Sequence, residues 1–204
     1  MERKECRFCS IRNGKYAHTF DEPILQTENF FSIVSVGDFV GGWSLVVPKE
    51  HVYSMRTYYS REDFWEFTNE CISHIKSIYG DRVIIFEHGA NSCESTTSCG
   101  TNHAHLHVVP FSKSIIDKMQ EDREWIKAKS NEIETIVADK EYLLYADPEK
   151  YAEESIFFVH ILEEAESQYF RRLLADCLGI EDYSYKSSPY YQKTADSFAA
   201  LKKV

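Results

Sequence analysis

Three histidines alternate with small or apolar residues in the segment His103-Ala-His-Leu-His-Val-Val-Pro110. Successive side chains of a β-strand point to opposite faces, so this spacing predicts a strand with all three imidazoles on one face and Ala104, Leu106 and Val108 in a core. Imidazole titrates near neutral pH and can act as nucleophile, acid, base or metal ligand. The alternative is histidines on a half-exposed sheet face, but three in strict alternation, closed by a proline, favour a functional site.

The distances along such a strand divide the three histidines into two groups. At roughly 3.3 Å per residue, neighbouring imidazoles lie about 6.6 Å apart and the outer two about 13 Å apart. Two neighbours can therefore act on one small charged group while the histidine at the far end serves another purpose. A catalytic metal bound by all three is a further alternative, which the separation of the outer pair disfavours unless the strand contains a bulge.

The segment resembles the signature of the histidine triad family of nucleotide hydrolases and transferases. That signature is His-x-His-x-His followed by two apolar residues, which Val108 and Val109 supply. Upstream, residues 28–34 and 42–51 are similar to that family's early strands. The resemblance covers about residues 5 to 112. It implies an α+β fold in which a largely antiparallel sheet is packed by helices.

The resemblance also implies roles for individual residues. His105 is then the nucleophile of a covalent nucleotidyl-histidine intermediate, and His107 binds the phosphate and aids proton transfer. The polar loop before the histidines lies where the family contacts phosphate, which implies Ser98, Gly100 and Thr101 as ligands; taken alone, it is an ordinary surface loop. The implied partner is a nucleotide or nucleotide conjugate, such as a dinucleoside polyphosphate, a nucleoside phosphoramidate or a nucleotide sugar.

Cys6-x-x-Cys9 supplies two thiolates at a spacing that suits tetrahedral zinc, although a redox pair or plain thiols would have the same pattern. A subset of the family completes a zinc site with the histidine of Pro-Lys-x-His and the first triad histidine, here His51 and His103. A closed site of four ligands has no position for water, so the zinc is expected to be structural. The chain has two further thiols that can displace a proposed ligand, Cys93 and Cys99.

Two positions depart from the family pattern. Many members carry another histidine where this chain has Trp43, and an indole, with one donor and no acceptor, cannot replace a histidine's proton relay. An asparagine common in the family appears here as Glu87 or His88, and a glutamate would repel a phosphate unless protonated or paired. These departures motivate an alternative function, a nucleotide-binding zinc protein with little or no turnover.

The strand Phe31–Ser35 corresponds to the strand that, in the family, forms the wall of the site for base and ribose.

Composition limits the class of partner. The chain has 204 residues, 43% of them hydrophobic, and a formal net charge of −10. This balance supports a folded globule and disfavours general binding to nucleic-acid polymers or anionic membranes, which need a basic surface. No apolar run approaches the roughly 20 residues of a membrane span, and the first residues lack a signal-peptide core. Six cysteines without a secretion signal predict a cytoplasmic protein with reduced or metal-bound thiols.

Beyond the resemblance, we expect a histidine-triad-like core at residues 1–112 and a mainly helical C-terminal extension at 113–204 packed on it. Helices are predicted over about 115–136, 163–178 and from 193, with strands near 142–145 and 156–162. Arg171 can reach a phosphate or an acidic substrate group, with a solvated helix face as the alternative. The extension can cover the site, select substrate or form a homodimer contact, and the sequence leaves these roles open.

Overall fold

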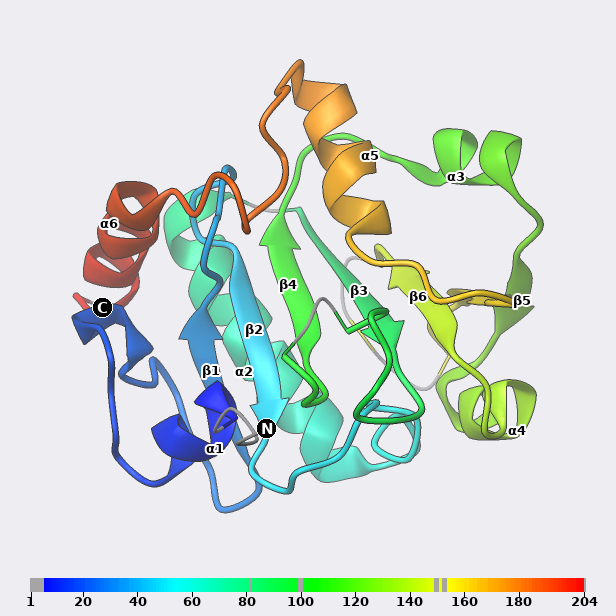
Figure 1. Cartoon of the computed structure of the whole chain (residues 1–204), viewed down its shortest axis with the longest axis horizontal. Coiled ribbons are helices and arrows are strands. Elements are labelled where there is room, and N and C mark those ends of the chain that lie inside the picture. The colour runs from blue at the N-terminus through cyan, green and yellow to red at the C-terminus, as the bar shows by residue number, and fades with distance from the viewer. Residues whose placement is uncertain (1–5, 81, 99–100, 149–150, 152–153, 204) are drawn as a thin grey trace.

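In the computed structural model, which describes residues 6–80, 82–98, 101–148, 151 and 154–203, one seven-stranded sheet runs through the chain. Its strand order is β1-β2-β4-β3-β6-β7-β5, and every neighbouring pair is antiparallel (Figure 1). The strands are β1 (Phe30–Val34), β2 (Ser44–Pro48), β3 (Val83–Gly89), β4 (Leu106–Pro110), β5 (Ile126–Ala128), β6 (Tyr142–Ala146) and β7 (Phe157–Ile161). The expected α+β class with a largely antiparallel sheet is confirmed.

Helices cover both faces of this sheet. They are α1 (Arg7–Arg12), α2 (Glu62–Tyr79), α3 (Ile116–Asp122), α4 (Ile133–Val137), α5 (Tyr169–Leu178) and α6 (Tyr191–Leu201), with short 3₁₀ turns at Thr19–Asp21 and Ser130–Glu132. In Figure 1, α2 lies behind the sheet, while α1 and α5 lie in front of it. None of the helices in the described part of the chain has the length and apolar character of a membrane span.

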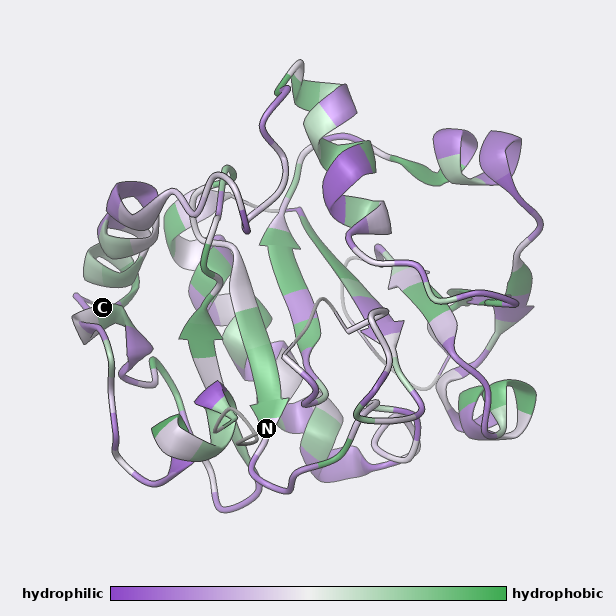
Figure 2. Cartoon of the chain, viewed as in Figure 1, coloured by the Kyte–Doolittle hydropathy of each residue, from purple (hydrophilic) through white to green (hydrophobic). Residues whose placement is uncertain are grey.

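The two faces of the sheet build two separate hydrophobic cores. Side chains at helical spacing on α2, among them Phe64, Phe67 and Ile75, pack on one face together with Leu106 and Val108. The other face packs against apolar residues of α1 and α5. Figure 2 shows hydrophobic colour along the central strands, interrupted on β3 and β4 by hydrophilic segments. Polar residues therefore lie inside the sheet at its centre.

The side chains alternate between the two faces from residue 103 onward, as predicted, although the strand β4 begins only at Leu106. The ladder of β4 begins only at Leu106, opposite Val46, so His103 and His105 precede the strand instead of belonging to it. The approach is held by Ala104, whose backbone N–H donates to the carbonyl of Val52 at 2.7 Å. Ala104 is still buried in the same core as Leu106, so the three histidines share the opposite side.

The predicted single helix over about 115–136 is wrong. The helix α3 ends at Asp122, and the following Arg123 is extended, with φ −160° and ψ 166°. Residues 126–128 then form β5, which pairs with β7. Sheet pairing outweighs local helix propensity here, as tertiary context often does. The helix expected over 163–178 forms only from Tyr169 onward and ends, as expected, at Gly179, whose φ is +68°.

The C-terminal half supplies helices and the strands β6 and β7, as expected, and also β5, which was not expected. β6 pairs with β3, β7 with β6, and β5 with β7, so residues after 113 continue the sheet begun by residues before it. Gly89 makes the close approach of β6 possible, because a Cβ there would lie 2.2 Å from the ring of Tyr142. The extension is therefore joined to the core by backbone hydrogen bonds as well as by packing.

A buried carboxyl also fixes this junction. Glu87 accepts hydrogen bonds from the hydroxyls of Tyr59 and Tyr142 and from the backbone N–H of Met55, on the face covered by α2. Burial raises the pKa of Glu87 from 4.5 to about 7, although these three hydrogen bonds act in the opposite direction. Glu87 is therefore directed away from the histidines and cannot repel a phosphate bound there.

The raised pKa of Glu87 predicts a pH-dependent stability difference for Glu87→Gln. The folded chain retains a proton that the unfolded chain has released, so this contribution to stability is present below pH 4.5 and is lost as pH rises toward 7. Relative to the wild type, the Gln variant should gain on the order of 2 kcal/mol in unfolding free energy between pH 5 and 7. Urea unfolding at the two pH values measures this gain, and a constant difference between the proteins would contradict it.

Candidate active site

His107 is held by an indole. It lies on β4 opposite Phe86 of β3, and the two rings stack with centroids 4.5 Å apart. Trp43, fully buried just before β2, donates its Nε1–H to Nδ1 of His107 at 2.9 Å. Because an indole nitrogen can only donate, Nδ1 of His107 must be an acceptor and the ring proton must be on Nε2. Burial keeps the pKa of His107 well below 6.5, so the neutral form persists.

His105 has the opposite tautomer. Its Nδ1 lies 2.9 Å from the backbone carbonyl oxygen of His103. A carbonyl oxygen only accepts, so Nδ1 of His105 carries the proton and Nε2 keeps a lone pair. Burial lowers the pKa of His105 from 6.5 to about 4. The centroids of the His105 and His107 rings are 4.8 Å apart, so a nucleophilic nitrogen and a hydrogen-bond donor come from adjacent rings.

Both histidines line a small chamber with two arginines. Its volume is about 50 Å³, and its wall includes Arg7, Arg171 and Thr101 in addition to the two histidines. Ligand pockets for drug-sized molecules measure roughly 300–1,000 Å³, so this chamber has room for only a small group such as a phosphoryl group. Arg7 is ion-paired with the buried Asp21, its Nη2 lying 2.5 Å from Oδ1, so the positive charge that suits an anion comes mainly from Arg171.

A wide groove adjoins the chamber. Its volume is about 920 Å³, and four residues line both cavities: Arg7, Val36, Thr101 and Tyr185. Although the chain contains 33 Asp and Glu residues, none of the described ones lines either cavity. The two cavities therefore form a continuous surface without carboxylates in an acidic protein.

Arg171 reaches the chamber from α5 and is itself 2% exposed. Its Nε donates to the carbonyl of Tyr183 at 3.0 Å and its Nη2 donates to the carbonyl of Gly37. Its guanidinium lies 4.6 Å from the ring centroid of Trp43. Arg171 therefore lies at the chamber and not on a solvated helix face, and its contact with a phosphate or an acidic substrate group stays a prediction. The same side chain also joins the extension to the loop after β1.

Only part of the loop predicted to contact phosphate lines the chamber. Thr101 lines it and donates its hydroxyl to the carbonyl of Ser98 at 3.0 Å. Ser98 is 1% exposed and does not line the chamber, and its Oγ has no hydrogen-bond partner among the described residues. Gly100, also predicted as a ligand, lies outside the described residues, as does Cys99. The strand Phe31–Ser35, predicted to receive the base and ribose, is buried, and only its last residue, Ser35, lines the chamber.

His88 is a site residue to which the sequence analysis gave no role. It lies on the histidine face of β3, with its ring centroid 6.2 Å from that of His107 and 5.3 Å from that of Phe170. It is 5% exposed, and neither ring nitrogen has a hydrogen-bond partner among the described residues. Burial lowers its pKa to about 3. The period of two along β3, with Glu87 on one face and His88 on the other, is the signal that could have identified it.

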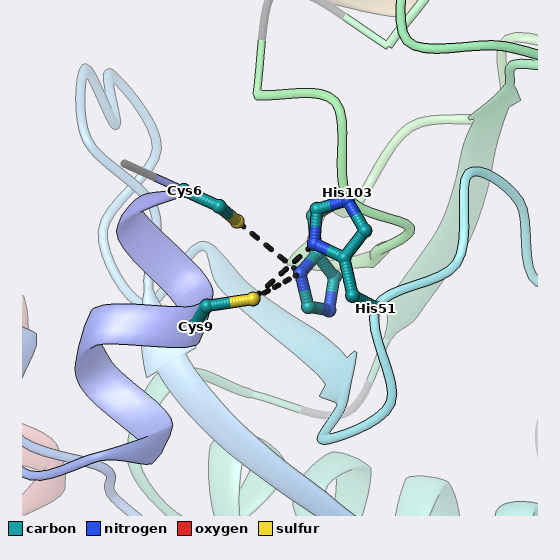
Figure 3. A group of neighbouring side chains, drawn as sticks. All are labelled: Cys6, Cys9, His51 and His103. Carbon is teal, nitrogen blue, oxygen red and sulfur yellow. Dashed lines mark hydrogen bonds between the residues drawn. The ribbon is translucent and has the colours of Figure 1, made fainter. Parts of the chain in front are cut away.

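The four predicted metal ligands come together at the other end of the histidine segment. The ligand atoms of Cys6, Cys9, His51 and His103 all lie within 4.8 Å of one another (Figure 3). Sγ of Cys6 is 3.3 Å from Nδ1 of His103, and Sγ of Cys9 is 3.2 Å from Nδ1 of His51. Zinc–sulfur and zinc–nitrogen bonds of about 2.3 and 2.0 Å in a tetrahedral site keep S and N about 3.5 Å apart, which these pairs approach.

The orientation of His103 also fits a metal ligand. Its Nε2 lies 2.8 Å from the carbonyl oxygen of Pro48, to which it must donate a proton. Nδ1 is then free of a proton and is directed at the thiols, the arrangement in which a backbone acceptor orients a metal-binding imidazole. The cluster can therefore hold a metal ion of the kind that two thiolates and two imidazoles bind.

Comparison with known proteins gives similarity at the level of structures only. No family model matches the chain, and no curated protein is similar to it. Among the solved structures that are similar to it are three of histidine triad or HIT-like proteins. One is a HIT-like protein involved in cell-cycle regulation from Bartonella henselae, with 12% identity, a TM-score of 0.40, and 58% of this chain and 88% of that chain covered.

The second, from Sulfolobus tokodaii, is described as a hypothetical histidine triad nucleotide-binding protein. It is 16% identical, with a TM-score of 0.39 and 97% of this chain and 95% of that chain covered. The third, a histidine triad protein from Clostridium difficile, is 24% identical, with a TM-score of 0.35 and 56% and 96% covered. Similarities with such scores do not support an inference about function, which depends on the side chains of this chain.

The two neighbouring arginines of α5 should differ strongly in their effect on stability. Arg171→Met leaves two buried carbonyls without their charged donor and should lower the unfolding free energy by roughly 2–4 kcal/mol. Arg172→Met removes a 41% exposed partner of Glu166 and should cost less than about 1 kcal/mol. Urea denaturation of both variants measures the difference, and equal losses would mean that Arg171 does not hold the extension in place.

Proposed function

We propose that the chain is a nucleotide hydrolase or nucleotidyl transferase that acts at a nucleoside phosphoryl group through His105. The observation that carries the proposal is the pair of opposite tautomers in one chamber. Nε2 of His105 has the lone pair needed to attack phosphorus, and Nε2–H of His107 can donate to a non-bridging oxygen. Both act in a cavity lined by Arg171 and Arg7, which suit a phosphate.

The two cavities support a division of the substrate. The chamber is large enough for the phosphoryl group, and the adjoining groove has room for a nucleoside. His18, Tyr185 and Tyr191 line this groove and offer aromatic surfaces to a flat base. The nucleoside then lies against residues of the C-terminal extension, and the extension selects substrate.

The chemistry begins when His105 forms a bond to phosphorus and the bond to the leaving group breaks. The Nδ1 proton stays on the hydrogen bond to the carbonyl of His103, which stabilises the positive charge that develops on the ring. Water or another acceptor then forms a bond to phosphorus, the bond from phosphorus to Nε2 of His105 breaks and returns the electron pair to the ring, and the acceptor's proton passes to solvent. Hydrolysis and transfer differ only in this acceptor.

A nucleotidyl adduct on His105 is the expected product of this step. The protein is incubated with adenine and guanine phosphate anhydrides and phosphoramidates, and intact mass and peptide mapping follow the adduct. The adduct should form in the wild type and in His160→Ala. His160 is the control because its Nδ1 is hydrogen-bonded to the backbone carbonyl of Glu124 at 2.8 Å and it lines neither cavity. The adduct should be absent from His105→Ala.

Two other results would contradict the proposed catalytic function. Nucleotide binding without an adduct or turnover from any donor would favour the alternative function, a nucleotide-binding protein without efficient catalysis. The indole in place of a relay histidine is the observation behind that alternative. Absence of both binding and adduct would remove both proposals.

We further propose that the ion held by Cys6, Cys9, His51 and His103 is structural zinc. The donor set and the hydrogen bond from His103 to Pro48 support this identity. Four protein ligands close the coordination, so the ion would tie α1 to the sheet and would not contact substrate. A cytoplasmic location and a homodimer remain predictions from the sequence and the resemblance.

The zinc proposal predicts metal contents for matched cysteine variants. Cys6→Ser should lose most of the zinc that copurifies with the wild type, because three ligands bind zinc far more weakly than four. Cys93→Ser should keep the wild-type content, since the thiol of Cys93 is outside the cluster. Elemental analysis of the purified proteins measures both, and unchanged zinc in Cys6→Ser, or its loss from Cys93→Ser alone, would refute the ligand set.

A further inference from the structure

We propose that Trp43 determines substrate specificity by holding His107 as a hydrogen-bond donor that cannot release a proton. The site is thereby restricted to substrates whose leaving group departs as an anion, which are phosphoric anhydrides and not phosphoramidates. This inference rests on the proposed function and narrows its substrate class. Trp43 does not touch the reacting atoms, so it acts as a positioning residue.

The hydrogen-bond partner of His107 determines which of its ring nitrogens carries the proton. Nδ1 accepts the indole N–H at 2.9 Å, which leaves a single ring proton on Nε2. An imidazole acts as a general acid only when both nitrogens carry protons. A proton on Nδ1 would point at the N–H of Trp43, and Trp43 is fully buried within a packed core and cannot easily turn away.

No described residue close to His107 replaces this missing acid. Nδ1–H of His105 is bonded to the carbonyl of His103, and its other nitrogen attacks the phosphorus. Arg171 is a permanent cation that donates to two carbonyls and does not release a proton. His88 is buried and uncharged at neutral pH, and no described carboxyl lines the chamber. Tyr185 and Thr101 also line the chamber, but a phenol or an alcohol is a weaker acid than an imidazolium. The leaving group must therefore depart without a proton from an imidazolium or a carboxylic acid of the chamber.

This constraint separates the substrate classes by bond chemistry. With an anhydride, the bond from phosphorus to oxygen breaks and oxygen keeps the electron pair, giving a phosphate anion that is stable at neutral pH. With a phosphoramidate, the bond from phosphorus to nitrogen breaks, and nitrogen must gain a proton to leave as a neutral amine. General acids contribute on the order of 10²–10⁴-fold to such steps, so their absence slows phosphoramidates selectively.

The test compares two donors with the same nucleotidyl group. Adenosine 5′-phosphoramidate needs a protonated leaving group, whereas the p-nitrophenyl ester of AMP releases a stable anion. Rates of adduct formation on His105 are measured with both donors for the wild type, for Trp43→His and for Trp65→His. Trp65 is the control, because its Nε1–H also donates to an acceptor, the carbonyl of Tyr59 at 2.8 Å, and it lies on α2, half-buried against the core on the other face of the sheet.

In Trp43→His, the new imidazole can accept a hydrogen bond from Nδ1–H of His107. This stabilises the cationic, acidic form of His107, which burial and Trp43 both disfavour in the wild type. The phosphoramidate rate relative to the ester rate should therefore rise by at least about tenfold. Trp65→His should leave this ratio within about twofold of the wild type. A purely structural role for Trp43 would lower both rates together and leave the ratio unchanged.

Four results would overturn the inference. One is a wild type that reacts with the phosphoramidate as fast as with the ester, and another is an unchanged ratio in folded Trp43→His. If that variant does not fold, ¹⁵N NMR of the wild type decides, because a proton on Nδ1 of His107 would exclude the proposed hydrogen bond. If neither donor forms an adduct although NMR finds Nδ1 unprotonated, the proposed function fails and the specificity fails with it.

Discussion

The alternation of side chains along β3 and β4 is the constraint on which the site depends. At the centre of the sheet each strand gives one face to the core under α2 and the other to the histidines. Glu87 and His88 are adjacent in sequence, yet the first bonds tyrosines behind the sheet while the second lies beside His107. Because the strands pair on both sides, this assignment of faces cannot slip by one residue without exposing a core residue to the chamber.

The histidine segment uses the same alternation to separate two kinds of chemistry. His103 is directed to the thiols by its bond to Pro48, while His105 and His107 are directed to the chamber. Each of the three rings has one nitrogen engaged by the protein, and the identity of the partner sets the state of the other nitrogen. Two backbone carbonyls and one indole thus set the protonation pattern of three chemically identical side chains, which is the basis of the different roles proposed for them.

Much of this arrangement can be predicted from the sequence. The spacing of the histidines gives their common side, the pattern of residues 142–162 gives β6 and β7, and the resemblance brings the four predicted metal ligands together. The sequence fails where long-range contacts decide. Residues 126–128 become a strand because β7 offers an edge, and nothing local indicates this. Arg171 is buried because carbonyls of Gly37 and Tyr183 lie within its reach. The effect of Trp43 on His107 depends on two strands meeting, so its sequence position alone could not reveal it.

One side chain joins the two halves of the histidine segment. Phe8 follows Cys6 and precedes Cys9 on α1, and its ring centroid lies 5.5 Å from those of both His103 and His105. It also lines the chamber. The proposed ion at the cysteines would consequently secure a wall of the chamber from a distance. Under the proposed function, starving the protein of metal would loosen that wall and admit water around His105, so metal supply would govern the proposed activity.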